Sequence, residues 1–243
     1  MLNERKVPLK IKTLYSGCWH DDGHPFNELC ANAEMARSPD DLKERESALI
    51  IWGGADIHPD YYKRPMHSTT HPGGMRDRLE WSLMQRAIEM QIPIFGVCRG
   101  AQMLCAAAGG WLIQDVRGHA GYGGHEVTTS DGETFHVNSI HHQMMVPNGV
   151  DHELVAWSTE HRAVTHQSPG RPAYGIDDDQ AWTPPEGWVE PEFIYFPKVN
   201  GYAIQWHPEG MKTDSPATKY ILNYITKKEN ARGKHSGIPV CAC

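Results

Sequence analysis

The sequence predicts an α/β domain in which a mainly parallel central sheet is flanked by helices. Short apolar runs that are typical of buried strands alternate with helical patterns along the chain, and this alternation favours a parallel sheet. The clearest unit joins an apolar run at residues 92–97 directly to a helical pattern that begins at Ala101 and stops at Gly109-Gly110. No internal repeat and no second-domain boundary interrupts the chain.

A single domain is therefore expected over residues 1–243, because 243 residues are enough for one large core. The core is expected to extend over residues 7–228, and the polar segment 229–243 is expected to form a tail. That tail ends in Cys241-Ala-Cys243, a pattern too short to identify a site.

The elements before the central unit follow from local patterns. In order, they are a strand at 7–15, a helix at 26–35, a short helix at 38–42, a strand at 48–52, a long loop at 57–75 and a helix at 77–91. The last of these is amphipathic, because its apolar residues recur at three- and four-residue spacing and acidic residues occupy its first turn.

The second half of the chain is expected to supply strands and one closing helix. The strands are predicted at 111–116, within 126–145 as hairpins with a turn at 130–132, and at 154–159, 193–196 and 202–206. Ser215-Pro216 is expected to open the closing helix. Its apolar face comprises Ala217, Tyr220, Ile221, Tyr224 and Ile225.

Composition excludes several classes of protein. The net charge of −7 and the lack of a basic stripe argue against binding to nucleic acid. No apolar run reaches membrane-spanning length, and the first residues do not form the apolar region of a signal peptide. The six cysteines have neither disulfide nor zinc-ribbon spacing, so a reducing, cytoplasmic location is expected.

Fifteen histidines raise the question of a metal site. His20 and His24, and likewise His67 and His71, are four residues apart, but both pairs lie in stretches typical of loops. No His-Glu-x-x-His sequence and no clustered Cys/His pattern occurs. The sequence therefore predicts no metal centre and no cofactor.

Cys98 is the first candidate for chemistry. It lies between the strand at 92–97 and the following helix, with glycines at 96 and 100. A turn this tight requires residues without a Cβ on either side of its apex, and it exposes the apex side chain to a reactant. The adjacent helix N-terminus favours the thiolate. The alternative is a buried cysteine that only packs in the core.

Gly53 and Gly54 end another predicted buried strand. The carboxyl ends of neighbouring parallel strands face the same cleft. A backbone N–H of Gly53 or Gly54, together with that of Arg99, would then form an oxyanion hole. The alternative is an ordinary tight turn.

His207 and Glu209 form the third group. A predicted strand delivers His207, Pro208 ends the strand, and Glu209 returns two residues later. A carboxylate in this position can hold one tautomer of the imidazole while the other ring nitrogen faces a thiol. Taken alone, a histidine at a strand end is more often structural.

Three segments resemble, in order and separation, the signatures of class I glutamine amidotransferases. They are Trp-Gly-Gly-Ala-Asp at 52–56, Gly-Val-Cys-Arg-Gly-Ala-Gln at 96–102 and Gln-Trp-His-Pro-Glu at 205–209. The resemblance covers roughly residues 48–225 and implies a flavodoxin-like α/β domain. It also implies a catalytic triad with Cys98 as nucleophile, His207 as general base and acid, and Glu209 as the orienting carboxylate. Gln102 matches the position that contacts the glutamine part of the substrate.

A further segment, residues 137–143, is similar to the family segment along the glutamyl pocket. The resemblance assigns Asn138, Ser139 and His141 to substrate binding. The alternative is a strand edge with exposed histidines.

Within the family, two segments resemble the stand-alone γ-glutamyl hydrolases of the peptidase C26 group, which includes γ-glutamyl-GABA hydrolases. They are the stretch from Gly53 to Tyr62 and the group Arg76-Asp77-x-x-Glu80. One departure concerns residues 15–48, which lack the second strand and the Gly-Gly-x-Pro turn that those hydrolases usually show. The other branch of the family supplies ammonia to a synthase.

The expected function is hydrolysis of γ-glutamyl amides, including glutamine, through a glutamyl thioester on Cys98. One alternative is a glutaminase subunit that delivers ammonia to a separate synthase, and another is a non-catalytic binding protein on the same fold. The long stretch 167–192 has no periodicity and carries three aromatic residues. It is expected to contact the amine part of the substrate or the synthase partner. The alternative is a loop that packs on its own surface. The amine, the oligomeric state and the pathway are left open.

Overall fold

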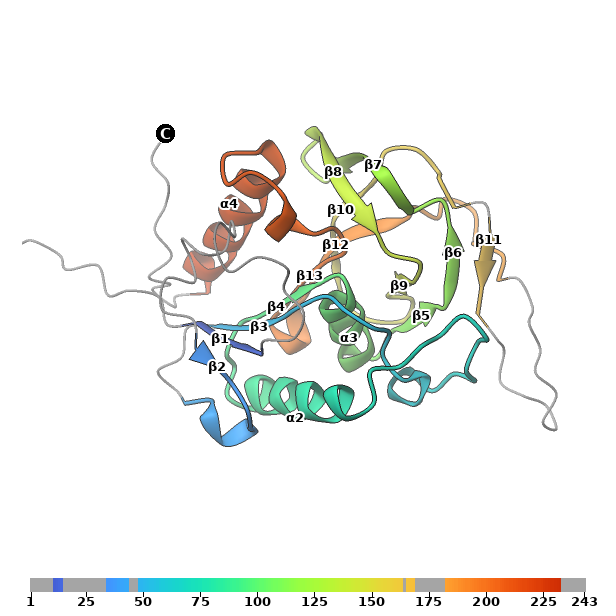
Figure 1. Ribbon diagram of the computed structural model, residues 1–243. Coiled ribbons are helices and arrows are strands. Elements are labelled where there is room, and N and C mark those ends of the chain that lie inside the picture. The colour runs from blue at the N-terminus through green and yellow to red at the C-terminus, as the bar shows by residue number, and fades with distance from the viewer. Residues whose placement is uncertain (1–10, 15–33, 44–47, 164, 169–181, 233–243) are drawn as a thin grey trace, which may run out of the picture.

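A nine-stranded sheet forms the centre of the molecule (Figure 1). The structure is a computed structural model, and it describes residues 11–14, 34–43, 48–163, 165–168 and 182–232. The strand order is β2-β1-β3-β4-β13-β12-β10-β7-β8. The expected α/β class is confirmed.

The first five strands in this order pair in parallel. They are β2 (Glu34–Met35), β1 (Ile11–Leu14), β3 (Ala48–Ile51), β4 (Ile94–Val97) and β13 (Gly201–Ile204). β3, β4 and β13 are buried along their whole length, as their continuous apolar runs predict.

Strand β2 corrects two expectations. The sequence predicted a helix at 26–35 and no second strand between residues 15 and 48, whereas Glu34 and Met35 pair in parallel with Lys12 and Thr13. A two-residue strand is too short to show a periodic pattern, so only its pairing partner reveals it. Residues 26–33 of the predicted helix lie outside the described residues.

The other strands of the sheet pair antiparallel. They are β12 (Pro191–Phe196), β10 (Glu153–Ser158), β7 (Ala120–Thr129) and β8 (Thr134–Ile140). Two small antiparallel pairs flank this half, β5 (Trp111–Ile113) with β9 (Met144–Val146) and β6 (Asp115–Arg117) with β11 (Thr165–Gln167). The hairpin turn predicted at 130–132 joins β7 to β8.

Helices cover both faces of the sheet (Figure 1). α2 (Met75–Glu89) and α3 (Arg99–Ala108) pack with Leu49, Ile51 and Ile94 on one face, and α4 (Pro216–Ala231) packs with Phe95 and Val97 on the other. Short 3₁₀ turns complete the described elements: η1 (Pro39–Asp41), η2 (Pro59–Tyr62), η3 (Pro197–Val199) and η4 (Pro208–Gly210). Among the helices described, none has the length and apolar character needed to cross a membrane.

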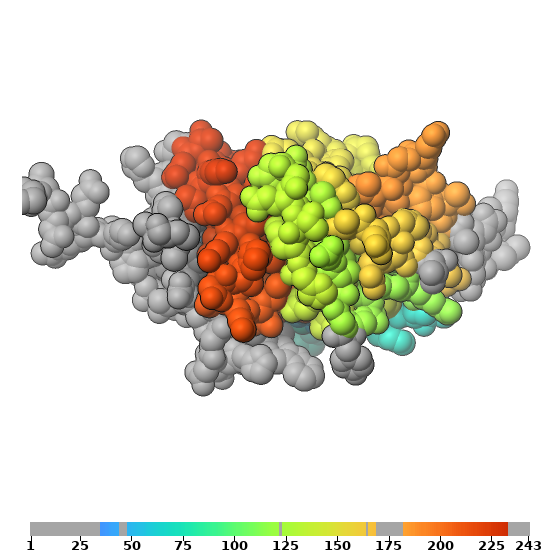
Figure 2. Space-filling view, turned by 90° about the horizontal axis from the view of Figure 1, so that it is seen from above, coloured from blue at the N-terminus to red at the C-terminus, as the bar shows by residue number. Residues whose placement is uncertain are grey.

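α4 begins as the sequence predicts, because the Ser215 hydroxyl accepts the Thr218 N–H at 3.2 Å and Pro216 follows the cap. Figure 2 shows α4 lying beside the β7–β8 hairpin on one face of the molecule. The Tyr220 ring lies 5.5 Å from the Phe135 ring of β8, so this helix joins the antiparallel half to the parallel half.

The parallel pairing decides where the site lies. Ile51 aligns with Gly96, and Val97 aligns with Ile204. The residues that follow β3, β4 and β13 therefore emerge at the same carboxyl edge of the sheet. These residues include Gly53, Cys98 and His207.

Candidate active site

Cys98 lies at a sharp turn between β4 and α3. Its backbone has φ 50° and ψ −106°, which is unusual for a residue with a Cβ. A Cβ on Gly96 would come 2.4 Å from the Gly100 carbonyl oxygen, and a Cβ on Gly100 would come 2.0 Å from the Ile51 carbonyl oxygen. Both glycines are thus required for the close approach of helix, turn and strand.

His207 follows β13 and pairs with Glu209. Its Nδ1 lies 2.6 Å from Glu209 Oε1, which fixes the orientation of the ring. Burial alone would lower the pKa of His207, but its interactions with Cys98 and Glu209 outweigh burial and raise the pKa from 6.5 to about 10. The imidazole therefore holds its proton at neutral pH.

Gly53 lies against both of these side chains. A Cβ at this position would come 2.8 Å from His207 Cε1 and 3.5 Å from Cys98 Cβ. The three segments singled out in the sequence therefore meet in space. Gly54 has φ 146°, which L-residues rarely adopt, and a Cβ there would overlap the Arg76 guanidinium.

Arg76 of α2 holds the turn at Gly53 in place. Its Nη2 donates to the carbonyl oxygens of Trp52 at 3.1 Å and Gly53 at 2.9 Å, and its Nε donates to Glu80 Oε1 at 2.8 Å. In a trans peptide the N–H points opposite to the C=O. The N–H groups of Gly53 and Gly54 therefore point away from Arg76.

The Arg99 side chain has a role that the sequence did not predict. It is 1% exposed and forms ion pairs with Asp77 and Glu80, both of α2. Since Glu80 also binds Arg76, one buried charge network joins the residue after Cys98 to the turn at Gly53. The predicted contribution of Arg99 to an oxyanion hole uses its backbone N–H, and the ion pairs of its side chain do not involve that group.

The other predicted substrate contacts have protein partners. Gln102 is buried, and its Nε2 donates to the Gln143 carbonyl oxygen at 3.2 Å. The Ser139 hydroxyl donates to the His119 carbonyl oxygen, and His141 Nδ1 lies 2.9 Å from the same Gln143 oxygen. Contact of these side chains with a glutamyl group stays a prediction. The alternative of a strand edge with exposed histidines is wrong for His141, which is 2% exposed.

Asn138 holds the backbone of His207. Its Oδ1 accepts the His207 N–H at 2.8 Å, and its Nδ2 donates to the His207 carbonyl oxygen at 2.8 Å. Both polar atoms of its side chain thus bind the His207 backbone, and contact of Asn138 with a glutamyl group stays a prediction. No local pattern indicates this contact, since 69 residues separate the two partners.

The described end of the long stretch 167–192 packs on the protein. The Trp182 ring makes edge contacts with the Trp188 ring at 5.1 Å and with the Trp111 ring at 5.4 Å. For residues 182–188, packing on the protein is therefore the better description, whereas residues 191 and 192 belong to the buried strand β12. Residues 169–181 lie outside the described residues, as do His20, His24 and the tail cysteines.

Comparisons with known proteins identify the family of this chain. The profile of the peptidase C26 family matches residues 33–209. The chain belongs to the peptidase C26 family. Class I glutamine amidotransferase-like proteins are thus the family to which this peptidase C26 chain belongs.

Two relatives illustrate the likeness. Protein NtpR of Enterococcus hirae is 30% identical over 186 residues, and the match covers 74% of each chain. Rv2859c of Mycobacterium tuberculosis, named as a candidate glutamine amidotransferase, is 30% identical over 183 residues. That match covers 72% of this chain and 54% of the relative, so the peptidase C26 protein spans about half of that relative's length.

Among solved structures, a candidate GMP synthase subunit from Thermoplasma acidophilum has the same fold. The superposition has a TM-score of 0.60 at 17% identity, and it covers 94% of this chain and 99% of that one. The expected class I glutamine amidotransferase fold is confirmed.

Proposed function

We propose that this protein hydrolyses γ-glutamyl amide bonds through a glutamyl thioester on Cys98. The observation that carries the proposal is the meeting of three strand ends: Cys98 at its strained turn, the His207–Glu209 pair, and Gly53 in contact with both. A core packing role for Cys98 would not require a residue with a Cβ at positive φ.

The proposed reaction proceeds in two halves. The Cys98 thiolate attacks the γ-carbonyl carbon, and the backbone N–H groups of Arg99 and of Gly53 or Gly54 stabilise the oxyanion. His207 gives its proton to the leaving nitrogen, the C–N bond breaks, and the amine departs. Water then loses a proton to His207 and attacks the thioester, so that glutamate leaves and the thiolate returns.

The site supports this chemistry with protein groups. Glu209 keeps the His207 ring oriented and stabilises the imidazolium. Arg76 fixes the peptides whose N–H groups would bind the oxyanion. Both cysteines described, Cys98 and Cys105, are free thiols, and we propose a reducing, cytoplasmic compartment for the reaction.

A second candidate is a glutaminase subunit that passes ammonia to a separate synthase. It is favoured by the superposition with a structure titled as part of a synthase, of which this chain covers 99%. On this alternative, the isolated protein would hydrolyse glutamine slowly and would be stimulated by the partner. On the stand-alone proposal, γ-glutamyl amines other than glutamine would be cleaved at full rate without a partner.

The decisive experiment is mass spectrometry after incubation with a library of γ-glutamyl amines. We expect a released amine and, after acid quenching, a peptide containing Cys98 that carries a glutamyl group. Cys98→Ala should give neither product while keeping the unfolding transition of the wild type. Release of amine by Cys98→Ala would refute the nucleophile assignment. Binding of γ-glutamyl ligands by the wild type without turnover or thioester would support a non-catalytic binding protein.

A further inference from the structure

A buried group of imidazoles and carboxylates lies outside the candidate active site. His119 precedes β7, His125 lies in β7, His141 follows β8, and Glu190 and Glu192 lie at the start of β12. All five residues are at most 4% exposed. No bond-making or bond-breaking step of the proposed hydrolysis uses them, although the resemblance assigns His141 to substrate binding.

Ligand atoms converge on one carboxylate. His119 Nδ1 lies 3.2 Å and His141 Nε2 lies 3.4 Å from Glu192 Oε1. Ligand atoms about 2.0–2.1 Å from a tetrahedral Zn²⁺ are separated from one another by about 3.3–3.4 Å. The two measured separations therefore match the edges of a zinc coordination tetrahedron.

Each of these three residues has an outer partner of the kind that metal ligands have. The second ring nitrogen of His119, Nε2, lies 2.7 Å from Glu190 Oε2. The second ring nitrogen of His141, Nδ1, lies 2.9 Å from the Gln143 carbonyl oxygen. His125 Nε2 lies 3.0 Å from Glu192 Oε1. Histidine ligands usually donate their second N–H to a carboxylate or carbonyl, and carboxylate ligands are themselves hydrogen-bonded.

These outer partners fix which nitrogen faces Glu192. A carbonyl oxygen only accepts, so His141 Nδ1 carries the proton and a neutral ring presents the lone pair of Nε2 to the carboxylate. His119 differs, because carboxylates face both of its ring nitrogens, and its Nδ1 presents a lone pair to a metal only once that nitrogen has lost its proton. Neither nitrogen forms a hydrogen bond in the structure, and Glu192 Oε2 also has no partner. A lone pair that faces a buried carboxylate favours a cation between the two groups, either a proton or a metal ion.

The charge of the group points in the same direction. Glu190 and Glu192 are 1% and 0% exposed, and within the described part of the chain their ion-pair partners are histidines. Two buried carboxylates without lysine or arginine partners favour a divalent cation.

We propose that His119 Nδ1, His141 Nε2 and the Glu192 carboxylate bind a divalent transition metal of the zinc type, with the fourth position open to water. Two imidazoles and one carboxylate match the donor preferences of Zn²⁺. The sequence predicted no metal centre, because the three ligands come from segments far apart in the chain and their spacing is not that of a local motif.

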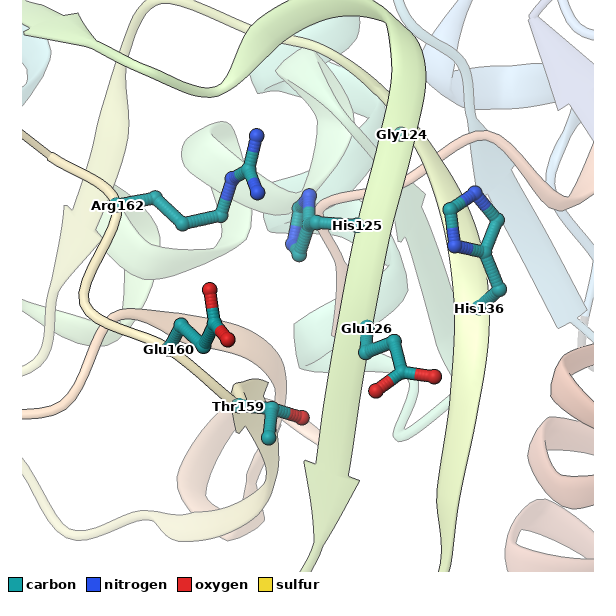
Figure 3. Close-up of a pocket in the computed structure, with 7 residues that line it drawn as sticks. All are labelled: Gly124, His125, Glu126, His136, Thr159, Glu160 and Arg162. Atoms are coloured by element: carbon teal, nitrogen blue, oxygen red, sulfur yellow. The ribbon is translucent and has the colours of Figure 1, made fainter.

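A cavity lies beside the proposed site, on the other side of His125. A hollow of about 260 Å³ is lined by Gly124, His125, Glu126, His136, Thr159, Glu160 and Arg162. Figure 3 shows the His125 ring and the Arg162 side chain on the same side of β7, whereas His136 lies on the neighbouring strand. Because His125 forms part of the cavity wall and touches Glu192, it separates the proposed site from solvent.

The experiment uses the full-length chain, treated with a chelator and then with iodoacetamide so that thiols cannot bind metal. Calorimetric titration with Zn²⁺, with metal counted by mass spectrometry, should give one high-affinity ion per chain. Glu192→Gln and His141→Gln should remove that ion. His125→Gln should weaken the affinity by about 10–100-fold, as expected for an outer partner.

Two matched histidine variants serve as controls. His136 lines the same cavity but bonds to the Gly123 carbonyl oxygen, and His161 contacts Glu190 from the surface. His136→Gln and His161→Gln should retain the ion at unchanged affinity. Loss of binding in these controls together with unchanged binding in Glu192→Gln would overturn the assignment.

A measurement on the wild type covers the case in which a ligand variant does not fold. Co²⁺ added to the metal-free wild type should give the visible absorption bands of a tetrahedral nitrogen–oxygen site, and one equivalent of Zn²⁺ should abolish them. Absence of such bands, with no Zn²⁺ bound, would overturn the proposal and show that protons alone hold the cluster together.

Discussion

At the scale of residues, the backbone of Cys98 explains why this cysteine is the reactive candidate. A residue with a Cβ at positive φ typically costs about 1–3 kcal/mol and persists only where surrounding contacts enforce it. Here the contacts at Gly96 and Gly100 enforce it. The same turn puts Cys98 against Gly53 and beside His207. Cys105, further along the same helix, is fully buried, and burial raises its pKa to about 12.

Alkylation should distinguish these two cysteines. The pKa of His207 is raised from 6.5 to about 10, so between these pH values the ring is a cation where an ordinary imidazole would be neutral. A neighbouring cation generally favours the reactive thiolate form of a cysteine. We therefore expect iodoacetamide at about pH 7 to label Cys98 well before Cys105, as read by peptide mass spectrometry.

The variant His207→Asn tests the cause. Without the imidazolium, labelling of Cys98 near neutral pH should slow by at least about tenfold, and the difference from wild type should shrink as the pH rises toward about 10 and His207 loses its proton. Equal labelling rates in wild type and variant near neutral pH would contradict the proposed ion pair.

At the scale of elements, the site depends on how closely α3 approaches β3. Gly100 is the first helical residue after Arg99, and a Cβ there would lie 2.0 Å from the Ile51 carbonyl oxygen, well inside contact distance. The helix therefore cannot keep its position with any larger residue. This close approach is what brings the turn at Gly53 next to Cys98.

Gly100→Ala should destabilise the protein by about 3 kcal/mol or more, because backbone rather than a flexible side chain blocks the added methyl group. Gly123→Ala is the matched control, since a Cβ at Gly123 meets nothing within 4 Å. Urea unfolding of both variants measures the difference. Similar stability for Gly100→Ala and wild type would disprove the close packing.

Helix α2 contributes to the site through Arg76. We expect Arg76→Lys to lower kcat by about 10–100-fold with little change in KM, less than the about 10²–10³-fold cost of deleting an oxyanion donor outright. A lysine cannot bond two carbonyl oxygens and Glu80 in the same plane. Steady-state kinetics on a γ-glutamyl substrate checks this.

Arg86→Lys serves as the control for that experiment. Arg86 lies on the same helix in an exposed pair with Glu89, so its replacement should leave both constants unchanged. A loss of kcat equal to that of Arg76→Lys would mean that α2 acts through general stability and not through the turn at Gly53.

At the scale of the whole molecule, the two halves of the sheet share the site. The parallel half supplies the ends of β3, β4 and β13, and the antiparallel half reaches the site through β8. Asn138 on β8 clamps the His207 backbone with both of its amide atoms. The orientation of His207 thus depends on the packing of one half against the other.

Asn138→Ala should therefore lower kcat by up to about 10²-fold, since small displacements of a catalytic group have costs of this size. Asn138→Asp should lie between this variant and the wild type, because a carboxylate still accepts the His207 N–H but cannot donate to the carbonyl oxygen. A loss of kcat without a change in the pH dependence of Cys98 labelling would count against the clamp.

Local sequence patterns are enough to predict the class of fold and the residues at the strand ends. Continuous apolar runs predicted β3, β4 and β13. The residues that follow neighbouring parallel strands are candidates for a functional site, because these strands end at the same edge of the sheet. The glycines around Cys98 predicted a turn without room for a Cβ, and the structure has this turn. These features are local, so the order of residues along the chain is sufficient to reveal them.

The contacts that distant side chains make with those residues are visible only in the folded structure. Three contacts join segments whose spacing in the chain shows no periodic or local pattern. They are the ion pairs of Arg99 with Asp77 and Glu80, the hydrogen bonds of Asn138 to His207, and the pairing of β2 with β1. The cluster around Glu192 is of the same kind, because its residues come from segments far apart in the chain. Contacts of this kind depend on strand order and on helix packing, and these are fixed by burial of the whole core rather than by any single stretch of sequence.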